Sequence, residues 1–454
     1  MELNDLFLRK RPNGQDFCAA IFIAACCGSV SLAQRYSVTV LPLPEGYEGA
    51  FPHGLNNRGE MCVYAFGFQG ENALVWRGNR VVTLPELPHE GRPNSWASDI
   101  NEDGVVVGRS EGLLGVWQAV MWPDENTIIP ILDRQSVASG LNEDLVVVGD
   151  YSVGFLEVNA FLWEDGEWFS LYPPMVFGQG VNNRKQVLGR TSYQGWLWEK
   201  GVFTALGGFE PGNYLVRASS INDHGRLAGG ITRTPESNSL PVIWTDLVPR
   251  EMPVVHPGLG GGIGQVNLAG LALGASYNRS QTDYRPTLWA GNLAMDLNEL
   301  IIDREARGWR VNTPWRFNDV GQVAATVQSF GQTYGWSVAR LDPIDTGLTL
   351  WGMEPSRPGT RNVIQVNHAT PGGRISLLWG TERGEPTSLV QCNGAMIDIV
   401  DPRLAATAVA GPDGRASFNV FIPASVLGLY VLQAVDHRTC EVSPTAWALL
   451  KTEN

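Results

Sequence analysis

The sequence is poor in charge, and above all in positive charge. Its 454 residues include 33 Lys and Arg against 46 Asp and Glu, which gives a net charge of −13 and a pI near 5.0. A protein that neutralises nucleic-acid phosphates needs a cationic surface. The shortage of Lys and Arg therefore argues against a general nucleic-acid-binding role, and we expect no nucleic-acid partner.

Residues that ligate metals are also scarce and poorly grouped. The six His residues show neither His-x-x-x-His spacing nor a Cys–His pair typical of a metal site. The Asn- and Asp-rich turns at 101–104 and 222–225 lack the distal Glu of an EF-hand loop. The glycine-rich run 258–264 fails the dinucleotide-binding spacing and is expected to form a loop. We therefore expect no metal, no cofactor and no catalytic residue.

Long apolar runs are absent apart from a single one near the N-terminus. Residues 9–11 are cationic, 17–30 are apolar but short for a membrane span, and 31–33 end in small residues. This pattern predicts that 1–33 is a signal peptide cleaved after Ala33, with no transmembrane segment in the mature chain. The alternative is a lipoprotein signal, because Ile-Ala-Ala-Cys at 23–26 resembles a lipobox, and Cys26 would then carry the lipid.

Cysteine is infrequent, with three of the six lying before residue 34. In an oxidising compartment we expect Cys392 and Cys440 to form a disulfide. The remaining Cys62 occupies a position at which other repeats carry Val or Leu. It is therefore expected to be a buried small hydrophobic residue.

What the sequence does have is a repeat. A small apolar or Ser residue, then Asn and a turn usually containing Gly, returns with spacings of 45, 41, 40, 40, 45 and 51 residues. A period near 44 residues is typical of β-propeller blades. Asn and Gly suit a hairpin reversal between two apolar strands, whereas Leu145 and Lys185 in place of Gly predict strained or different turns in copies three and four. The copies begin at Asn56, Asn101, Asn142, Asn182, Asn222, Asn267 and Asn318.

Each copy divides into four short strands, the third of which usually ends in Trp. In copy two the strands are expected at 97–100, 105–108, 118–122 and 127–132. The regular Trp position predicts packing between repeats, and in copy seven Val338 takes its place. The six Trp are Trp76, Trp122, Trp163, Trp198, Trp244 and Trp289.

The last copy lacks a fourth strand, and a spare strand precedes the first copy. Residues 36–42 match the fourth-strand pattern, so we expect them to complete the last repeat and close the ring. Closure would remove two exposed sheet edges. The sequence therefore predicts an all-β, seven-bladed β-propeller over residues 34–342.

The repeats resemble the HAF repeat of bacterial extracellular proteins. The stretch Asn-Ala-Phe-Leu-Trp at 159–163 stands where the family has His-Ala-Phe, and 295–300, 308–309 and 317–323 are similar to the family's usual ending. The resemblance covers about 36 to 342 and implies the fold and an extracellular location, but no shared activity.

After residue 343 the period stops. Residues 343–454 alternate apolar runs with turns, a texture that predicts a small, Ig-like β-sandwich. The segment resembles C-terminal sandwiches on secreted bacterial proteins, which often carry one Cys near the middle and another near the end, as at Cys392 and Cys440.

The variable loops offer the best candidate for function. Loops between second and third strands, and between repeats, should emerge on one face, and loops commonly carry binding residues. Aromatic and Arg side chains suit recognition of a glycan or a protein. The candidate binding residues are Trp96, Trp117, Tyr151, Tyr214, Arg217, Tyr277, Arg279 and Tyr284.

The leading hypothesis is an exported, non-enzymatic binding or scaffold protein, extracellular or in the cell envelope, whose partner is an extracellular glycan or protein. One alternative is a glycan-active hydrolase or lyase that uses Glu71, Asp150 or Asp283, for which two carboxylates about 5 to 10 Å apart would be evidence. The other is a structural cell-envelope component that self-associates.

Overall fold

The computed structural model describes residues 35–452, except 69, 93, 155–156, 211, 303–307, 330–335, 345–346, 390–391 and 393–394. The predicted signal peptide, including Cys26, lies outside the described residues. The described chain is all-β and consists of small antiparallel sheets, with two 3₁₀ turns, η2 (Leu113–Gly115) and η3 (Leu297–Glu299). None of the sheets formed by these residues closes on itself. In the same part of the chain, no helix is long and apolar enough to cross a membrane.

Five sheets contain four strands that are consecutive in the sequence and antiparallel, and we call them units 1 to 5. Their strands are β2 (Tyr47–Leu55), β3 (Met61–Gly67), β4 (Gly70–Arg77) and β5 (Arg80–Thr83) in unit 1; β6 (Ser95–Ile100), β7 (Val106–Glu111), β8 (Trp117–Asp124) and β9 (Thr127–Pro130) in unit 2; β10 (Ser136–Leu141), β11 (Val147–Val153), β12 (Glu157–Glu164) and β13 (Glu167–Ser170) in unit 3; β14 (Phe177–Val181), β15 (Val187–Arg190), β16 (Gly195–Glu199) and β17 (Val202–Ala205) in unit 4; and β18 (Leu215–Ile221), β19 (Leu227–Thr232), β20 (Leu240–Thr245) and β21 (Val248–Glu251) in unit 5.

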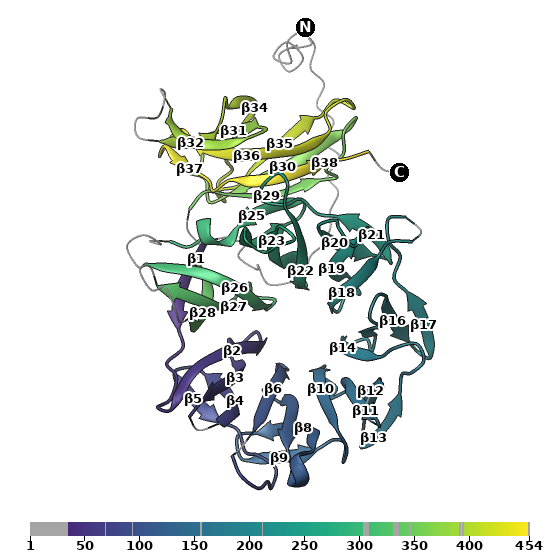
Figure 1. Ribbon diagram of the computed structural model, residues 1–454. Helices are drawn as coiled ribbons and strands as arrows, with labels where there is room; N and C mark the ends of the chain where they lie inside the picture. The colour runs from purple at the N-terminus through teal and green to yellow at the C-terminus, as the bar shows by residue number, and fades with distance from the viewer. Residues whose placement is uncertain are drawn as a thin grey trace.

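Two further units complete a ring of seven (Figure 1). Unit 6 contains β22 (Gly260–Val266), β23 (Leu271–Tyr277), β24 (Tyr284–Ala290) and β25 (Leu293–Asp296). Unit 7 contains β26 (Trp309–Phe317), β27 (Val323–Ser329) and β28 (Ser337–Ile344), and takes its fourth strand, β1 (Arg35–Val40), from the other end of the chain.

The pairing of β1 with β28 confirms the predicted completion of the last repeat. The strands are antiparallel, with Tyr36 opposite Pro343 and Val40 opposite Ala339. The Tyr36 side chain is buried, and its backbone N–H also donates to the carbonyl oxygen of Leu300 at 2.8 Å. The first and last described parts of the ring are therefore joined by both backbone bonds and core packing.

The repeated asparagines do more than form their own hairpins. In every unit the side-chain oxygen accepts the backbone N–H four residues later, at 2.7 to 2.9 Å. The side-chain Nδ2 of each donates to the backbone oxygen of the next unit's asparagine, at 2.8 to 3.4 Å. The last of these bonds runs from Asn318 to Asn56, so the seven bonds form a closed circle, which we call the asparagine ring. All seven side chains are buried.

The turns after the ring asparagines share one backbone conformation. The third residue after Asn has positive φ in every unit, from 59° to 86°, and five of these residues are Gly. The other two are Leu145 at 60° and Lys185 at 59°. Of the two predicted alternatives, a different turn type is therefore wrong and a strained turn is confirmed, because these side chains occupy the left-handed region that Gly adopts without steric cost.

The third-strand Trp residues pack between units, as predicted. Trp122 of unit 2 shares a buried cluster with Cys62 and Val75 of unit 1, and Val338 is buried in the corresponding place of unit 7 beside Trp76. Trp122 Nε1 also donates to Pro85 O at 2.7 Å in the connection between units. Cys62 is a buried free thiol, as expected.

The rest of the described chain forms a C-terminal module that lies against units 6 and 7 (Figure 1). Its disulfide joins Cys392 to Cys440, with a Cα–Cα distance of 5.2 Å, as the sequence predicts. Three sheets share its strands, namely β29 (Thr349–Glu354), β30 (Arg361–Asn367) and β35 (Ala416–Phe421); β38 (Ala446–Leu450), β36 (Gly428–Asp436), β31 (Arg374–Gly380) and β34 (Arg403–Val409), with β37 (Glu441–Val442) beside β36; and β32 (Arg383–Ser388) with β33 (Met396–Ile399).

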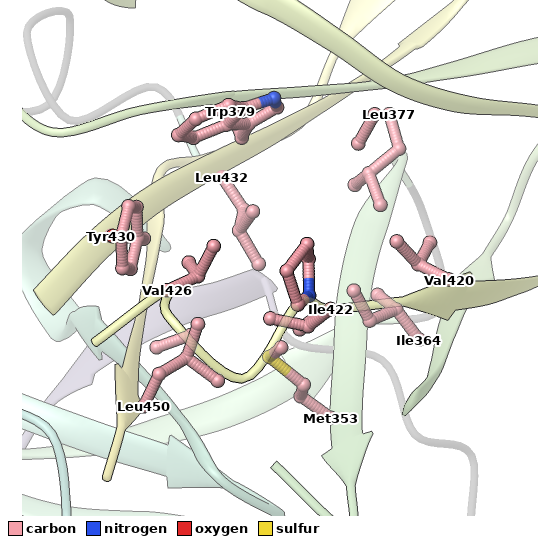
Figure 2. A pocket seen from close by; sticks show the side chains of 13 residues that line it. Met353, Ile364, Leu377, Trp379, Val420, Ile422, Val426, Tyr430, Leu432 and Leu450 are labelled. Carbon is pink, nitrogen blue, oxygen red and sulfur yellow. The ribbon is translucent and has the colours of Figure 1, made fainter. Parts of the chain in front are cut away.

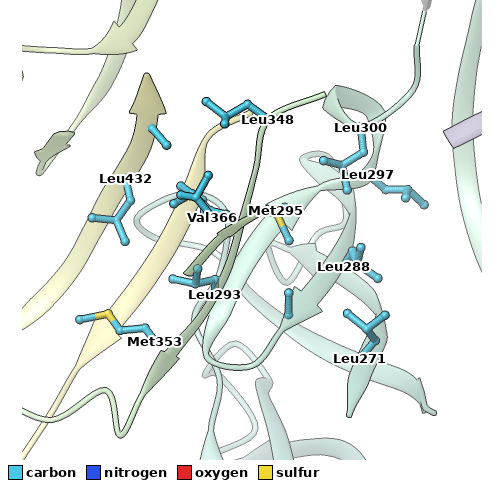
Figure 3. Packing of buried hydrophobic residues seen from close by; sticks show 14 of the residues in the cluster. Leu271, Leu288, Leu293, Met295, Leu297, Leu300, Leu348, Met353, Val366 and Leu432 are labelled. Atoms are coloured by element: carbon cyan, nitrogen blue, oxygen red, sulfur yellow. The ribbon is translucent and has the colours of Figure 1, made fainter. Parts of the chain in front are cut away.

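The module is bonded to the ring rather than tethered to it. Strand β38 pairs with β25, so unit 6 and the module form one nine-stranded sheet. Figure 3 shows the adjoining core, in which Leu293 and Met295 of unit 6 pack with Met353 and Leu432 of the module. Burying an aliphatic side chain contributes about 2 kcal/mol, so this junction holds the two parts together.

Candidate functional site

The two ends of the ring carry different parts of each unit. The asparagine turns join first to second strands and lie at one end, which we call the turn face. Because the strands are antiparallel, the connections from second to third strands emerge at the opposite end, which we call the loop face. The predicted residues Trp96, Trp117, Tyr277 and Tyr284 all lie where strands meet this face.

A β-bulge recurs in the first strand of all seven units. In each unit the pairing with the second strand skips the residue three positions before the ring asparagine, so this residue has no partner in the strand register. A bulge re-aims the side chain it carries and often lies beside a functional site. The bulged residues are His53, Ser98, Ser139, Gln179, Ser219, Gly264 and Trp315.

Aromatic side chains of units 7, 1 and 2 form a continuous cluster at the loop face. Tyr64 stacks on Trp96, with ring centroids 4.0 Å apart and planes 12° apart. The His53 ring lies 5.2 Å from Trp96 and 5.6 Å from Trp315, so it links units 2 and 7. We call this set the aromatic wall, and its members are Phe51, His53, Tyr64, Phe66, Trp96, Trp315 and Trp336.

An arginine extends the aromatic wall to Trp117. The Arg109 guanidinium lies 5.0 Å from the Trp96 ring centroid and 4.3 Å from that of Trp117, which is cation–π geometry. Burial lowers the Arg109 pKa, which Glu71 and Tyr64 partly offset. Burial, followed by a hydrogen bond with Glu71, raises the Tyr64 pKa to about 12. Both hydroxyl and guanidinium are therefore in their proton-donating forms at neutral pH.

A polar hollow of about 410 Å³ lies at the loop face between units 5 and 6, and Pro314 of unit 7 also lines it. Its lining includes Arg217, Tyr277 and Tyr284, three of the predicted binding residues. The two tyrosine rings stack, with centroids 6.2 Å apart and planes 9° apart. This volume is within the range of about 300 to 1,000 Å³ typical of small-molecule sites.

Glycine creates this hollow. Residues 260–264 of the run predicted as a loop belong instead to strand β22, which contributes Gly262 and Gly264 to the lining. A Cβ on Gly262 would lie 3.2 Å from the Tyr277 hydroxyl oxygen, so a side chain there would crowd the tyrosine. The prediction failed because Gly is depleted in strands, where it often marks a close approach by another group.

The remaining predicted residues are dispersed. Tyr151 is a correction: it is only 7% exposed and packs in the core of unit 3 with Val147 and Phe161. Alternation of side chains along β11 turns it inward. Tyr214 is exposed and contacts Tyr193 edge-on at 5.8 Å, while Arg279 is exposed on the loop after β23.

The three candidate carboxylates have separate partners in units 1, 3 and 6. Glu71 is hydrogen-bonded to Tyr64, and Asp283 forms an ion pair with Arg285 at 3.0 Å. Asp150 accepts the backbone N–H of Gly178 at 2.7 Å. Burial raises the Asp150 pKa to about 7, against the opposing effects of that N–H and of Arg190. The three carboxylates therefore lie in three different units and do not form a pair with one another.

The turn face also carries carboxylates, and they are engaged by backbone groups. Where the residue after a ring asparagine has a side-chain oxygen, that oxygen accepts a hydrogen bond from the backbone N–H of the equivalent residue in the preceding unit. Examples are the bonds donated by Asn57 to Glu102, by Glu102 to Glu143 and by Leu268 to Asp319. Among the described residues no group of His, Cys, Asp and Glu could hold a metal ion.

The C-terminal module contains an apolar cavity of about 60 Å³ between its sheets. Figure 2 shows Trp379, Leu377, Met353 and Tyr430 around it. Its exposed lining is apolar, so it offers few hydrogen-bonding groups to a sugar. We therefore place the candidate site on the loop face of the ring.

Sequence reasoning missed most of the aromatic wall, including Phe51, His53, Tyr64 and Trp315. The signal that could have found them was position within the repeat. Phe51 and Trp96 both lie five residues before a ring asparagine, and His53 and Trp315 both lie three before. The repeat spacing alone does not reveal the bulge that displaces these last two residues from the ladder.

Comparisons with known proteins add little to the fold. The chain matches no protein-family model and no curated protein. Among solved structures it is similar to a fungal alcohol oxidase of the AA5 family in complex with copper, at 10% identity over 92% of this chain and 99% of that chain, with a TM-score of 0.38. It is also similar to Kuenenia stuttgartiensis hydrazine synthase, at 9% identity over 89% of this chain and 62% of that chain, with a TM-score of 0.23.

Proposed function

We propose that this protein is an exported, non-enzymatic binding protein that recognises a glycan at the loop face of a seven-bladed β-propeller. The observation that carries the proposal is the aromatic wall, in which the half-buried Trp96 and Trp117 rings lie against the Arg109 guanidinium and Trp96 stacks on the buried Tyr64. Aromatic faces carry negative electrostatic potential, and sugar rings expose faces of slightly positive C–H groups. Binding of a sugar ring against such a wall is the chemistry this arrangement favours.

Several features support the propeller as the scaffold. Seven four-stranded units lie around one axis, the asparagine ring links each unit to the next, and β1 completes unit 7. We further propose that the units are HAF-type repeats and that the C-terminal module is an Ig-like sandwich. In this proposal the module positions the ring, to which β38 joins it.

Export is the second part of the proposal. The residue pattern of 1–33 and the disulfide between Cys392 and Cys440 support delivery to an oxidising compartment. We place the mature protein outside the cell or in the cell envelope. Mass spectrometry of the secreted chain would test this: an N-terminus at Gln34 fits the cleavage, whereas a lipidated Cys26 would replace it with the lipoprotein route.

Binding to glycan and peptide arrays tests the proposed function. The mature chain should bind a set of glycans, and Trp96→Ala and Trp117→Ala should each weaken the array signal clearly. The matched control is Trp168→Ala, an exposed Trp on the outer strand β13 of unit 3. Binding only to peptides, or binding unchanged in both wall variants, would overturn glycan recognition at this site.

The alternatives predict different results. A hydrolase or lyase would shorten a bound oligosaccharide over time, and this activity would depend on Asp150 or another carboxylate. A structural envelope component would assemble with rising concentration in the absence of any ligand. Product analysis by mass spectrometry and sedimentation velocity of the same preparation separate these outcomes from simple binding.

A further inference from the structure

Three arginines occupy equivalent places around the loop face of units 2, 4 and 5. Arg109 pairs across the sheet with Trp96, and Arg190 pairs with Phe177. Arg217 lies on the first strand of unit 5, five residues before the ring asparagine. This is the position that the two aromatic residues occupy in units 2 and 4. The repeat therefore places three guanidinium groups on one level of the ring, at the same end as the aromatic wall.

A fourth arginine lies one level closer to the asparagine ring. Arg316 is two residues before Asn318 and is half-buried. Its charge acts on His53, Cys62 and Asp99 of units 1 and 2, which places it under the aromatic wall. Together with burial, the larger cause, it lowers the His53 pKa to about 3, so His53 is neutral and adds no positive charge at this level.

These four arginines form no direct ion pair with any described residue. Arg109, Arg190 and Arg316 are half-buried, a level of burial at which most other arginines do form one, whereas Arg217 is exposed. Arg190, Arg217 and Arg316 each donate to one backbone oxygen, that of Thr191, Ser192 and Trp315, respectively. Arg109 lies against two indole rings. Because a guanidinium has five N–H donors, each keeps donors that could bind an anion.

The nearby carboxylates are occupied by other groups. Glu71 is hydrogen-bonded to the Tyr64 hydroxyl. Asp99 accepts the backbone N–H groups of Ile100 and Leu141, at 3.0 and 3.3 Å, and Asp150 accepts that of Gly178. Burial raises the pKa of Asp99 to about 6 and that of Asp150 to about 7, so Asp150 is only partly ionised at neutral pH, whereas Asp99 is largely ionised. Glu71 acts on the charge of Arg109, Asp150 on that of Arg190 and Asp99 on that of Arg316, but none of them forms a direct ion pair with its arginine.

One of the arginines lies at the polar hollow between units 5 and 6. Arg217 lines it together with Ser219, Thr232 and Ser239. The Arg190 charge lies close enough to Arg217 for the two to repel, since Arg217 contributes, after burial, to lowering the Arg190 pKa. Two like charges held near a polar hollow are stabilised by an anion that binds between them.

We infer that the ligand of the loop face is an acidic polysaccharide, whose sugar rings pack on the aromatic wall and whose anionic groups bind Arg109, Arg190 and Arg217. This inference rests on the proposed glycan recognition and adds the chemical class of the sugar. Carboxylate and sulfate groups share the required chemistry, because both accept two parallel N–H bonds from a planar guanidinium. A neutral glycan would offer the remaining N–H donors of these arginines no anionic partner.

Isothermal titration of the full mature chain with four polymers tests the inference. Polygalacturonate supplies carboxylates on sugar rings, dextran sulfate supplies sulfates, unsubstituted dextran is neutral, and poly-glutamate has carboxylates without sugar rings. We expect at least one acidic polysaccharide to bind about tenfold or more tightly than dextran and poly-glutamate. Its affinity should fall as NaCl is raised from 0.05 to 0.5 M, because salt screens the arginine charges.

Paired substitutions locate the effect. The double variant Arg190→Gln and Arg217→Gln should bind the acidic polysaccharide about tenfold to a hundredfold more weakly, since charge-assisted hydrogen bonds are lost. The matched control is Arg80→Gln with Arg415→Gln, which removes the same charge from exposed arginines of unit 1 and the C-terminal module. The control should bind like the parent, and thermal unfolding of both doubles should confirm that they fold.

The possible failures are distinguishable. If dextran or another neutral glycan binds as tightly as the acidic ones, or if the double variant binds like the control, the acidic class is wrong while glycan recognition stands. If poly-glutamate binds as tightly as the polysaccharides, the site recognises anions in general and the inference is overturned. If no polysaccharide binds and the glycan array is also blank, the proposed function fails with it.

Discussion

The turn face and the loop face are built by the same seven units and differ in chemistry. At the turn face every unit contributes a buried Asn, and the seven form a closed circle of hydrogen bonds. At the loop face the equivalent positions differ from unit to unit, with Phe51, Trp96, Arg217 and Gly262 in units 1, 2, 5 and 6. The positions that repeat build the ring, and the positions that vary supply the candidate site.

The physical reason lies in what each face must satisfy. A ring of like units needs the same contact between every neighbouring pair, and a buried amide left without a partner costs about 1 to 3 kcal/mol. The turn face is therefore held to one residue type. Side chains at the loop face are partly solvated, so variation there is tolerated and can create the aromatic wall, the hollow and the four arginines that form no direct ion pair.

The largest expected effect on stability comes from a substitution in the asparagine ring, and it tests the difference between the two faces. Asn142→Ala removes the acceptor of the Val146 N–H and the donor to Asn182 O. Leaving these buried groups unsatisfied should lower the free energy of unfolding by about 2 to 4 kcal/mol, measured by urea denaturation. Asp144→Ala, in the exposed part of the same turn, is the control and should change stability little. Equal stabilities of the two variants would show that the ring bonds are dispensable.

A second prediction concerns the cost of a buried carboxyl at the loop face. The Asp150 pKa is 3.8 in the reference state and about 7 when folded, mainly because of burial. A carboxyl with a raised folded pKa contributes its stability below pH 4 and loses it as the pH rises through 7. Asp150→Asn should therefore gain stability over the parent between pH 4 and pH 8, on the order of 2 kcal/mol after allowance for partial solvent exposure.

Urea denaturation of both proteins at pH 4, 6 and 8 measures this gain. Asn keeps an oxygen that can accept the Gly178 N–H, so the variant changes the titration and preserves the acceptor. A difference between the two proteins that does not change with pH would show that Asp150 titrates as it does in water, and that the loop face carries no such cost.

The third prediction is on binding. Trp117→Ala should weaken polysaccharide binding about tenfold, which corresponds to about 1.4 kcal/mol, because a ring beside Arg109 is lost. Its unfolding should change less than that of Asn142→Ala, since Trp117 is only half-buried at the start of β8. Trp168→Ala on the outer strand should bind normally. Isothermal titration and thermal unfolding of the same samples provide both measurements.

The smallest effect should come from placing Gly at the turn-face position where unit 3 has Leu145. Leu145 has φ of 60°, where five other units have Gly. Leu145→Gly should relieve steric strain of about 1 to 2 kcal/mol at the cost of greater freedom in the unfolded chain. We expect a net gain of about 0.5 to 1 kcal/mol in urea denaturation, with no change in ligand binding. A loss of stability would mean that the Leu145 side chain contributes more than its backbone costs.

The sequence predicts contacts that are local or periodic and misses those that need a second unit. Spacing identified the strands, the spare strand at Tyr36 and the packing of the third-strand Trp. It assigned each Asn to its own hairpin and missed the bond from Nδ2 to the next unit. The partner of that bond lies 40 to 51 residues away, except where Asn318 closes the ring on Asn56. The junction of β25 with β38 had no signal, since it joins a repeat to a segment without a period.

The same division applies to the candidate site. Trp96, Trp117, Tyr277 and Tyr284 lie at strand ends, so their place on the loop face follows from antiparallel order, and their role in binding stays a prediction. Tyr151 was wrong because strand alternation turns it into the core of unit 3.

The most direct test of the account is titration of one acidic polysaccharide into the parent, Asn142→Ala and Trp117→Ala, with affinity expressed per folded molecule. The account predicts that Asn142→Ala, although less stable, binds like the parent, and that Trp117→Ala binds about tenfold more weakly while remaining folded. The opposite result, with affinity lost in the turn-face variant and kept in the loop-face variant, would contradict the assignment of architecture to one face and recognition to the other.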